Sequence, residues 1–205
     1  MKCLWPVIAS FEAVTRIVIV RAELSNPEFC ETRALKPSVY EPMIERGMSQ
    51  GGRTRPIKVD VCLEPISRDL FGRLGLLCDN GINNDGKINK RDGTARIFLD
   101  CGDEYETPPP ARDVILEQCR KGNDDSIPSA IVAVGPERGW TEGEAKVFVN
   151  ECGFDSAMLG SSILRVDTAV VSGLGIVSAA LDECQQQQIN GDIEMHERKR
   201  SKIPH

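Results

Sequence analysis

The chain has 205 residues, 40% of them apolar, with 25 Lys and Arg against 31 Asp and Glu and a formal charge of −6. This size and composition predict one globular domain with a real core. The acidic balance excludes a surface that binds nucleic acid through overall charge, so any RNA contact needs a local basic patch. The 8 Cys lack a C-x-x-C pair, which predicts reduced thiols and no metal site, in the cytoplasm or, in a eukaryotic host, an organelle. No apolar run reaches transmembrane length.

The first 14 residues contain one Lys and a short apolar stretch that Pro6 interrupts. This is a poor match to a secretory signal, and a transit peptide would carry more Arg and Ser. We therefore interpret 1–14 as a lead-in segment, a truncated helix whose tail covers 5–14. Beyond it, β-branched runs or alternating apolar residues predict strands at 15–20, 57–61, 74–78 and 95–99. Helices are expected at 38–50, with Pro42 in the first turn, and around 114–119.

Residues 79–94 are polar and resemble a calcium-binding loop only superficially. With Gly86 at the sixth position of such a loop, Gly81 stands at the first, where a carboxylate is needed. Asp92 then stands at the twelfth position, where a bidentate Glu is needed. We therefore expect a flexible polar insertion between two strands, with no calcium.

Four cations cluster within a short stretch of the chain. They are Arg46, Arg53, Arg55 and Lys58. One interpretation is a patch that contacts RNA phosphates, with Arg46, Arg53 and Arg55 as the candidates. The other is an ordinary solvated face, since such clusters are common. The sequence leaves both open.

The most informative stretch begins at residue 130. An unbroken apolar run over 130–134 predicts a strand of a parallel sheet, buried on both faces. Gly135, Pro136 and Gly139 then force a sharp turn. Thr141 and Glu144 have the spacing of a capping box, which predicts that a helix starts here. The stretch is therefore a strand, a Gly-containing loop and a helix.

A second loop of the same kind follows. Met158 and Leu159 suggest a short strand, Gly160 opens an irregular loop, and a helix is expected from about 166 to 181. We expect the two strands to be neighbours, and two such loops at the carboxyl ends of neighbouring parallel strands form a crevice for a small molecule. Neither G-x-G-x-x-G nor the P-loop pattern is present, so nucleotide binding of those types has no support. Residues 184–205 are polar and Gln-rich, and we expect them to be disordered.

The two loops together resemble one family. Residues 135–144 read G-P-E-R-G-W-T-E-G-E and residues 159–169 read L-G-S-S-I-L-R-V-D-T-A. The pair is similar to the small-subunit ribosomal RNA uridine-N3 methyltransferases of the SPOUT superfamily. The resemblance implies an α/β fold over 15–183, with a parallel sheet, helices on both faces and a C-terminal trefoil knot. It further implies S-adenosylmethionine as the cofactor and uracil N3 of small-subunit ribosomal RNA as the target. The amino-terminal RNA-binding domain of the family has no counterpart in this chain.

The resemblance also assigns roles to individual residues. Arg165 becomes the catalytic candidate, stabilising charge on the uracil carbonyls or steering RNA phosphate; the alternative is a surface ion pair with Asp167. The residues implied in cofactor binding are Gly135, Pro136, Glu137, Gly139, Leu159, Gly160, Ile163, Leu164, Thr168 and Ala169. For Leu159, Ile163 and Leu164 the alternative is core packing, for Glu137 a favourable charge at a helix start, and for Thr168 a helix cap.

Three positions depart from the family pattern: Arg138 replaces a Gly, Ser162 an Arg and Asp167 a Glu. If position 138 required positive φ, Arg would cost on the order of 1 kcal/mol. The family also implies a homodimer through the knot and the last helix. Two alternatives stay open: a methyltransferase of the same superfamily with another RNA target, and a catalytically lapsed module for RNA binding or dimerisation.

Overall fold

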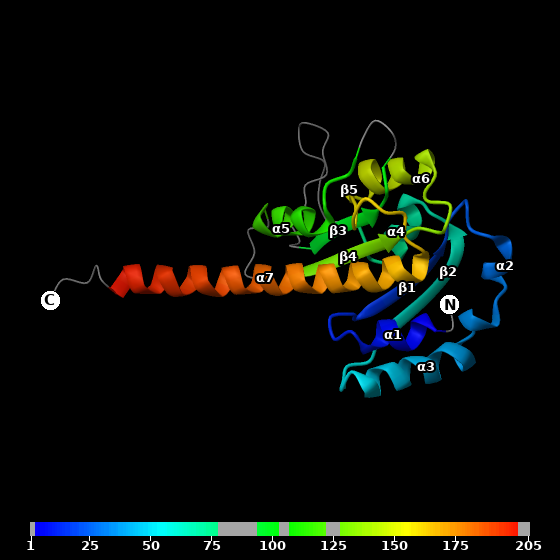
Figure 1. Cartoon of the computed structure of the whole chain (residues 1–205), viewed down its shortest axis with the longest axis horizontal. Helices are drawn as coiled ribbons and strands as arrows, with labels where there is room; N and C mark the ends of the chain where they lie inside the picture. Colours follow the sequence, from blue (N-terminus) through cyan, green and yellow to red (C-terminus); the bar gives the residue numbers. More distant parts are fainter. Residues whose placement is uncertain (1–2, 78–93, 103–106, 122–127, 201–205) are drawn as a thin grey trace.

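A computed structural model describes residues 3–77, 94–102, 107–121 and 128–200 of the chain. The predicted insertion at 79–94 therefore lies outside the described residues except for Thr94. In the described part, parallel strands are covered by helices, and one long helix extends beyond them (Figure 1). The fold is thus a mixed α/β arrangement, as expected.

The strands form two parallel sheets, where the sequence had suggested one. Strand β1 (Arg16–Arg21) pairs with β2 (Lys58–Pro65) in the smaller sheet. In the larger sheet β3 (Thr94–Leu99) is central, with β4 (Ser129–Val134) on one side and β5 (Asp155–Ala157) on the other. The expectation of a single sheet does not hold, because hydrogen-bonded pairing is not continuous between the two groups of strands in the described residues.

The helices connect and cover these strands. Residues 33–35 form a turn of 3₁₀-helix and 147–151 a turn of π-helix directly after α6. The α-helices are α1 (Leu4–Ser10), α2 (Pro27–Cys30), α3 (Pro37–Gln50), α4 (Arg68–Arg73), α5 (Ala111–Lys121), α6 (Glu142–Lys146) and α7 (Val166–Arg200).

Strand β3 separates two apolar clusters because neighbouring side chains of a strand point to opposite faces. Ile97 is fully buried in a cluster with residues of α5 and α7, such as Ile115 and Ala180. Phe98 is buried in an aromatic cluster with Phe148 and others on the opposite face. The larger sheet therefore has packed elements on both faces, and β3 is held from both sides.

A third cluster joins the amino-terminal helices to the smaller sheet. Trp5 of α1 lies against Tyr40 of α3, with ring centroids 5.1 Å apart, and its indole N–H donates to the carbonyl of Ala34 at 3.1 Å. Ile17 of β1 belongs to the same cluster. The lead-in segment is therefore part of the core, as α1 shows.

The expected disordered tail is wrong for residues 184–200, which continue α7. This stretch is rich in Gln, Glu, Met and Arg, which are good helix formers, and contains no Pro. A polar composition can therefore support a helix that has already been nucleated by a packed segment. Figure 1 shows this part of α7 extending past α5 and away from the sheets.

Two further expectations need correction. The strand predicted at 74–78 is absent in the described residues 74–77, where Leu74 instead follows the last turn of α4. The hydroxyl of Ser67 accepts from the N–H of Leu70 at 3.3 Å and starts that helix, a cap that the apolar run after it had obscured. Pro42 lies inside α3 rather than in its first turn.

Candidate functional site

The carboxyl ends of the three strands of the larger sheet lie at one edge. Leu99 is in register with Val134 on one side and with Ala157 on the other. The loop that follows β4 (residues 135–141, here the first loop) and the one that follows β5 (158–165, the second loop) therefore leave the same edge. They are separated by the width of β3, which places their starts about 10 Å apart. The two motifs predicted loops at the ends of neighbouring strands; the loops do leave the same edge, but β3 lies between β4 and β5.

The first loop is a tight turn. The N–H of Gly139 donates to the carbonyl of Pro136 at 2.9 Å, and Gly139 has φ of 75°. Glu137 and Arg138 are exposed at the tip of the turn. Since none of the described non-glycine residues has positive φ, Arg138 carries no backbone strain. Replacement of the family Gly at this position is therefore compatible with the turn, because the left-handed conformation falls on Gly139.

Trp140 links the first loop to the end of β3 by a hydrogen bond. Its indole N–H donates to the carbonyl of Leu99 at 3.0 Å. Its ring lies over Gly135, where an added Cβ would come within 3.0 Å of the ring. The other side of the ring meets the edge of buried Phe148, at 4.9 Å between centroids. A bulkier residue at 135 would displace this ring, so Gly135 and Trp140 are matched in size.

Glu144 holds the base of the first loop. It forms the predicted capping box with Thr141, whose N–H donates to Oε2 at 3.0 Å. Its other oxygen, Oε1, accepts from the N–H of Glu23 at 2.8 Å, beyond the end of β1. The side chain is 7% exposed. One carboxylate thus joins the first loop to the smaller sheet.

The second loop offers open space and an exposed apolar side chain. Gly160 is exposed, and a Cβ added there would meet no atom within 4 Å; the same holds for Gly139 in the first loop. Ile163 is 84% exposed, which excludes core packing of this side chain within one chain. Leu159 does pack in the core, against Gly173 of α7. Leu164 is half-buried.

The amino end of α7 carries the catalytic candidate. The Arg165 guanidinium pairs with Asp167 at 3.3 Å, and its side chain is 85% exposed. Asp167 Oδ1 accepts from the N–H of Thr168 at 2.9 Å. This backbone hydrogen bond, more than the neighbouring Arg165, holds the pKa of Asp167 below its usual value. The Asp167 carboxylate thus accepts a hydrogen bond from a backbone N–H in the first turn of α7. Thr168 is the third residue of this helix and lies inside it, so it does not cap the helix. Ala169 is half-buried on the next turn.

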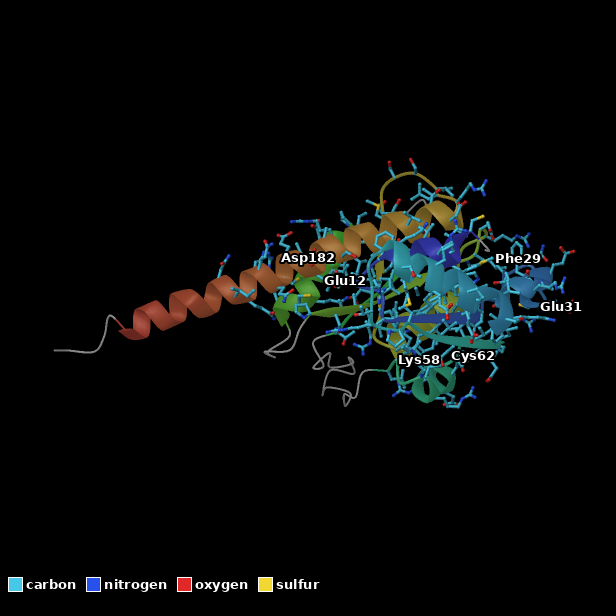
Figure 2. All side chains as sticks on the ribbon, turned by 90° about the horizontal axis from the view of Figure 1, so that it is seen from below. Glu12, Phe29, Glu31, Lys58, Cys62 and Asp182 are labelled. Carbon is cyan, nitrogen blue, oxygen red and sulfur yellow. The ribbon has the colours of Figure 1, made fainter. Side chains whose placement is uncertain are left out.

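Two of the three arginines predicted for RNA, Arg53 and Arg55, lie before the start of a strand and not after the end of one. Arg53 and Arg55 precede the amino end of β2, which Lys58 marks in Figure 2, whereas the two loops leave the carboxyl ends of β4 and β5. Arg53 is half-buried and donates to the carbonyl of Phe11 after α1. Arg46 and Arg55 are exposed. The structure thus gives Arg53 a packing role and does not bring the cluster together with Arg165.

Three side chains that hold the first loop were not among the site residues predicted from the sequence: Trp140, Glu144 and Glu23. Trp140 stands inside the quoted motif and could have been chosen from it. Glu144 was recognised only as a cap. Glu23, whose carboxylate accepts from the Thr141 hydroxyl at 3.0 Å, lies in an irregular segment with no pattern and could not have been found.

A wide hollow elsewhere on the surface has a different character. It lies beside α4 and is lined by Glu64, Arg68, Arg73 and other residues. Its arginines already have partners: Arg73 pairs with Glu64, and Arg68 donates to the carbonyl of Glu151 at 2.7 Å. Both arginines are thus engaged with groups of the chain itself, and the hollow adds nothing to the site at the two loops.

Two kinds of feature are absent from the described residues. No group of three or more His, Cys, Asp or Glu there could hold a metal ion. Likewise, none of the helices in the described part of the chain is both long enough and apolar enough to cross a membrane.

Comparison with known proteins points to one chemistry. Residues 83–178 match the model of a family described as an RNA methyltransferase domain. No curated protein matches the sequence significantly.

Solved structures share the fold. A probable rRNA-methyltransferase from Porphyromonas gingivalis superposes with a TM-score of 0.61 at 16% identity, covering 89% of this chain and 62% of its own. A protein from Legionella pneumophila in complex with S-adenosylmethionine gives 0.54 at 20% identity, covering 88% and 62%. Ribosomal RNA small subunit methyltransferase E from Neisseria gonorrhoeae, bound to S-adenosylmethionine, gives 0.51 at 21%, covering 87% and 60%. The chain spans about three fifths of the length of these proteins.

Proposed function

We propose that the chain, whose residues 83–178 match the model of the RNA methyltransferase domain family, binds S-adenosylmethionine between the first and second loops and methylates RNA. The observation that carries the proposal is the position of the loops. They leave one sheet edge on either side of β3, with open space at Gly139 and Gly160. In this proposal a flat adenosyl group fills this space, and a side chain added at either glycine would project toward it. The solved relatives with bound S-adenosylmethionine support the choice of cofactor.

We propose that the target is uracil N3 in small-subunit ribosomal RNA, in the cytoplasm or an organelle where ribosomes are assembled. The motif resemblance and the relative from Neisseria gonorrhoeae support this assignment. S-adenosylmethionine supplies an electrophilic methyl group on a sulfonium. In the transfer, the N3 proton of uracil leaves and negative charge develops on the adjacent carbonyl oxygens. Arg165 is exposed at the end of the second loop, where its guanidinium would stabilise that charge.

The remaining cofactor contacts come from backbone and side chains of both loops. Trp140 and Glu144 hold the first loop in place before the cofactor arrives, so little ordering is needed on binding. In this proposal Ile163 and Leu164 contact the cofactor or a second copy of the chain. The cofactor contacts proposed are Gly135, Pro136, Glu137, Gly139, Leu159, Gly160, Ile163, Leu164, Thr168 and Ala169.

Two features of the family enter the proposal. One is a trefoil knot formed by passage of the second loop behind the first; the other is a homodimer through the knot and α7. The exposure of Ile163 and Val171 supports an interface on this side of the molecule. Of the RNA candidates, Arg46 and Arg55 remain proposals as exposed cations, and Arg53 is the weakest because it is engaged with Phe11.

Calorimetry with S-adenosylmethionine, followed by transfer of a labelled methyl group to small ribosomal subunits or their RNA, tests the proposal. A matched pair of variants places the site. Gly160→Ala and Gly175→Ala each add one methyl group where no atom lies within 4 Å, one in the second loop and one on α7. Because Gly160 has φ of 154°, which alanine rarely adopts, the melting temperature of each variant is measured beside its cofactor binding. We expect Gly160→Ala to weaken cofactor binding at least tenfold and Gly175→Ala to leave it unchanged. Equal effects of the two changes would contradict the site.

One observation favours a second candidate, a lapsed module that binds RNA or forms dimers. Ser162 stands where the family pattern has an Arg, and Arg165 is already paired with Asp167. A folded sample that binds no S-adenosylmethionine would favour this candidate. Binding and methyl transfer to an RNA other than small-subunit ribosomal RNA would instead favour a related enzyme with another target.

A further inference from the structure

Two cysteines meet where α7 leaves the body of the molecule. The side chains of Cys119 on α5 and Cys184 on α7 interact with each other in the apolar contact between the two helices. Both belong to the apolar contacts between these helices: Cys184 is 5% exposed in the cluster, and Cys119 packs against it while remaining half-buried. Figure 2 labels Asp182, two residues before Cys184, on the part of α7 that runs beside the body, and the helix continues past it outward.

The surrounding contacts hold the two helices in fixed positions. Arg112 of α5 pairs with Glu183 of α7 at 2.6 Å, directly beside Cys184 in the sequence. Ile115 of α5 and Ala180 of α7 are fully buried in the same cluster. The two cysteines therefore lie among packed and paired residues of both helices.

We propose that Cys119 and Cys184 form an oxidant-sensitive pair, and that a peroxide converts them to a disulfide that joins α5 to α7. The half-buried Cys119 meets the peroxide first: its sulfur takes one oxygen to give a sulfenic acid, and one water leaves. The Cys184 sulfur then attacks that sulfur, the S–S bond forms, and the hydroxyl leaves with the Cys184 proton as a second water. Two thiols and one peroxide thus yield one disulfide and two waters, and dithiothreitol reverses the step.

The environment sets the rate of this reaction. Burial, together with the hydrogen bond and the charge of Cys184, raises the pKa of Cys119 to about 12. Since the thiolate is the reactive form, oxidation is slow at neutral pH and faster in alkaline solution. The proximity of Cys119 and Cys184 determines which disulfide forms, and the pKa of Cys119 determines the rate at which it forms. The pair does not take part in the proposed methyl transfer, so its test is independent of that proposal.

A tryptic map of the oxidised protein tests the pairing directly. The chain is treated with hydrogen peroxide while folded, unreacted thiols are alkylated, and the protein is digested without reduction. Cleavage at Arg and Lys places Cys119 in peptide 113–120 and Cys184 in peptide 166–198, each as its only Cys. We expect these two peptides to appear joined, and to separate after dithiothreitol. Cys101→Ser, which removes an exposed cysteine, should leave the joined species intact, and Cys119→Ser should abolish it.

The wild-type map decides the question even if a variant folds poorly. Oxidation of Cys101 without the joined peptides, or mixed pairing of Cys119 with other cysteines at equal yield, would overturn the proposal. The disulfide closes a loop of about 65 residues, so the oxidised protein should melt on the order of 10 °C higher than the reduced one. A lower melting temperature after pairing would show that the bond does not fit the native contact.

Discussion

Glu144 accepts a hydrogen bond from the backbone N–H of Glu23 at 2.8 Å, although 121 residues separate them. The same carboxylate accepts from the N–H of Thr141 at 3.0 Å. The first loop is therefore tied both to its own helix and to the end of β1. A charged acceptor that serves two buried or half-buried donors contributes more than an ordinary cap, because its loss leaves both donors unsatisfied.

Replacement of Glu144 should be costly for stability. In Glu144→Gln one acceptor oxygen becomes an amide NH₂ that faces an N–H donor, so we expect a loss of about 1–3 kcal/mol in the free energy of unfolding. Urea unfolding measures it. Glu142→Gln is the control, since Glu142 lies on the same helix, is exposed and pairs only with Lys146 at 2.6 Å. Similar losses in the two variants would show that the link to Glu23 adds nothing.

The turn in the first loop depends on one left-handed glycine. Gly139→Ala should destabilise the protein by about 1 kcal/mol, because φ of 75° is unfavourable for alanine. Gly143→Ala, four residues later in α6, should stabilise it by about 0.5–1 kcal/mol, since alanine favours the helix. Thermal unfolding of both variants compares the two effects. The same sign for both would contradict the described turn.

Close packing of α1 on α3 requires Gly47. A Cβ at this position would lie 2.2 Å from the carbonyl oxygen of Pro6, a backbone atom that cannot rotate away. We expect Gly47→Ala to cost about 3 kcal/mol in chemical unfolding, at the upper end of overpacking effects. Gly175→Ala is the matched helical control and should be neutral or stabilising. If Gly47→Ala unfolds like the wild type, the packing of the lead-in helix is not as described.

Acid should weaken the pairing within the smaller sheet. Partial burial raises the pKa of Asp60, but Arg16 at 2.7 Å and Lys58 at 3.5 Å outweigh it and hold that pKa below its usual value. The carboxylate therefore stabilises the folded state above the unfolded pKa of about 4, and this contribution is lost as the pH falls through the folded pKa. The stability difference between wild type and Asp60→Asn should be full at about pH 7 and should shrink below about pH 4. A difference that is constant across this range would exclude the ion pair as its source.

Arg165 should matter for activity and not for folding. Its side chain is exposed and its pair with Asp167 lies at the surface, so Arg165→Ala should leave the melting temperature unchanged. If the proposed function holds, methyl transfer to RNA should fall at least tenfold while S-adenosylmethionine binding persists. Lys146→Ala, which removes another exposed and paired cation, should alter neither. Wild-type transfer rates in Arg165→Ala would remove this residue from the mechanism.

Local patterns in the sequence were sufficient for the elements around the site. The apolar run at 130–134 became β4, the run at 95–99 became β3, and the capping box at Thr141 and Glu144 is present. The predicted burial of 130–134 on both faces is wrong: these residues are only half-buried, because β4 lies at the end of the strand order. These signals are local: β-branched residues favour strands, and the Thr hydroxyl serves an N–H three residues away. The prediction of a strand at 74–78 was wrong because the apolar residues that follow the short helix α4 have the same composition as a strand. The prediction of a disordered tail was wrong for 184–200 because these polar residues continue a helix whose first part is packed against the body.

By itself the sequence determined the two loops, their glycines and the order of strand, turn and helix around them. Only the tertiary structure decided that β3 lies between the loops, that the Trp140 indole reaches Leu99, and that the Glu144 carboxylate holds Glu23. It also decided that Ile163 is exposed and that Cys119 meets Cys184. The reason is physical. Such contacts join residues far apart in the chain, and they depend on sheet order and helix packing, which no local spacing of residue types encodes.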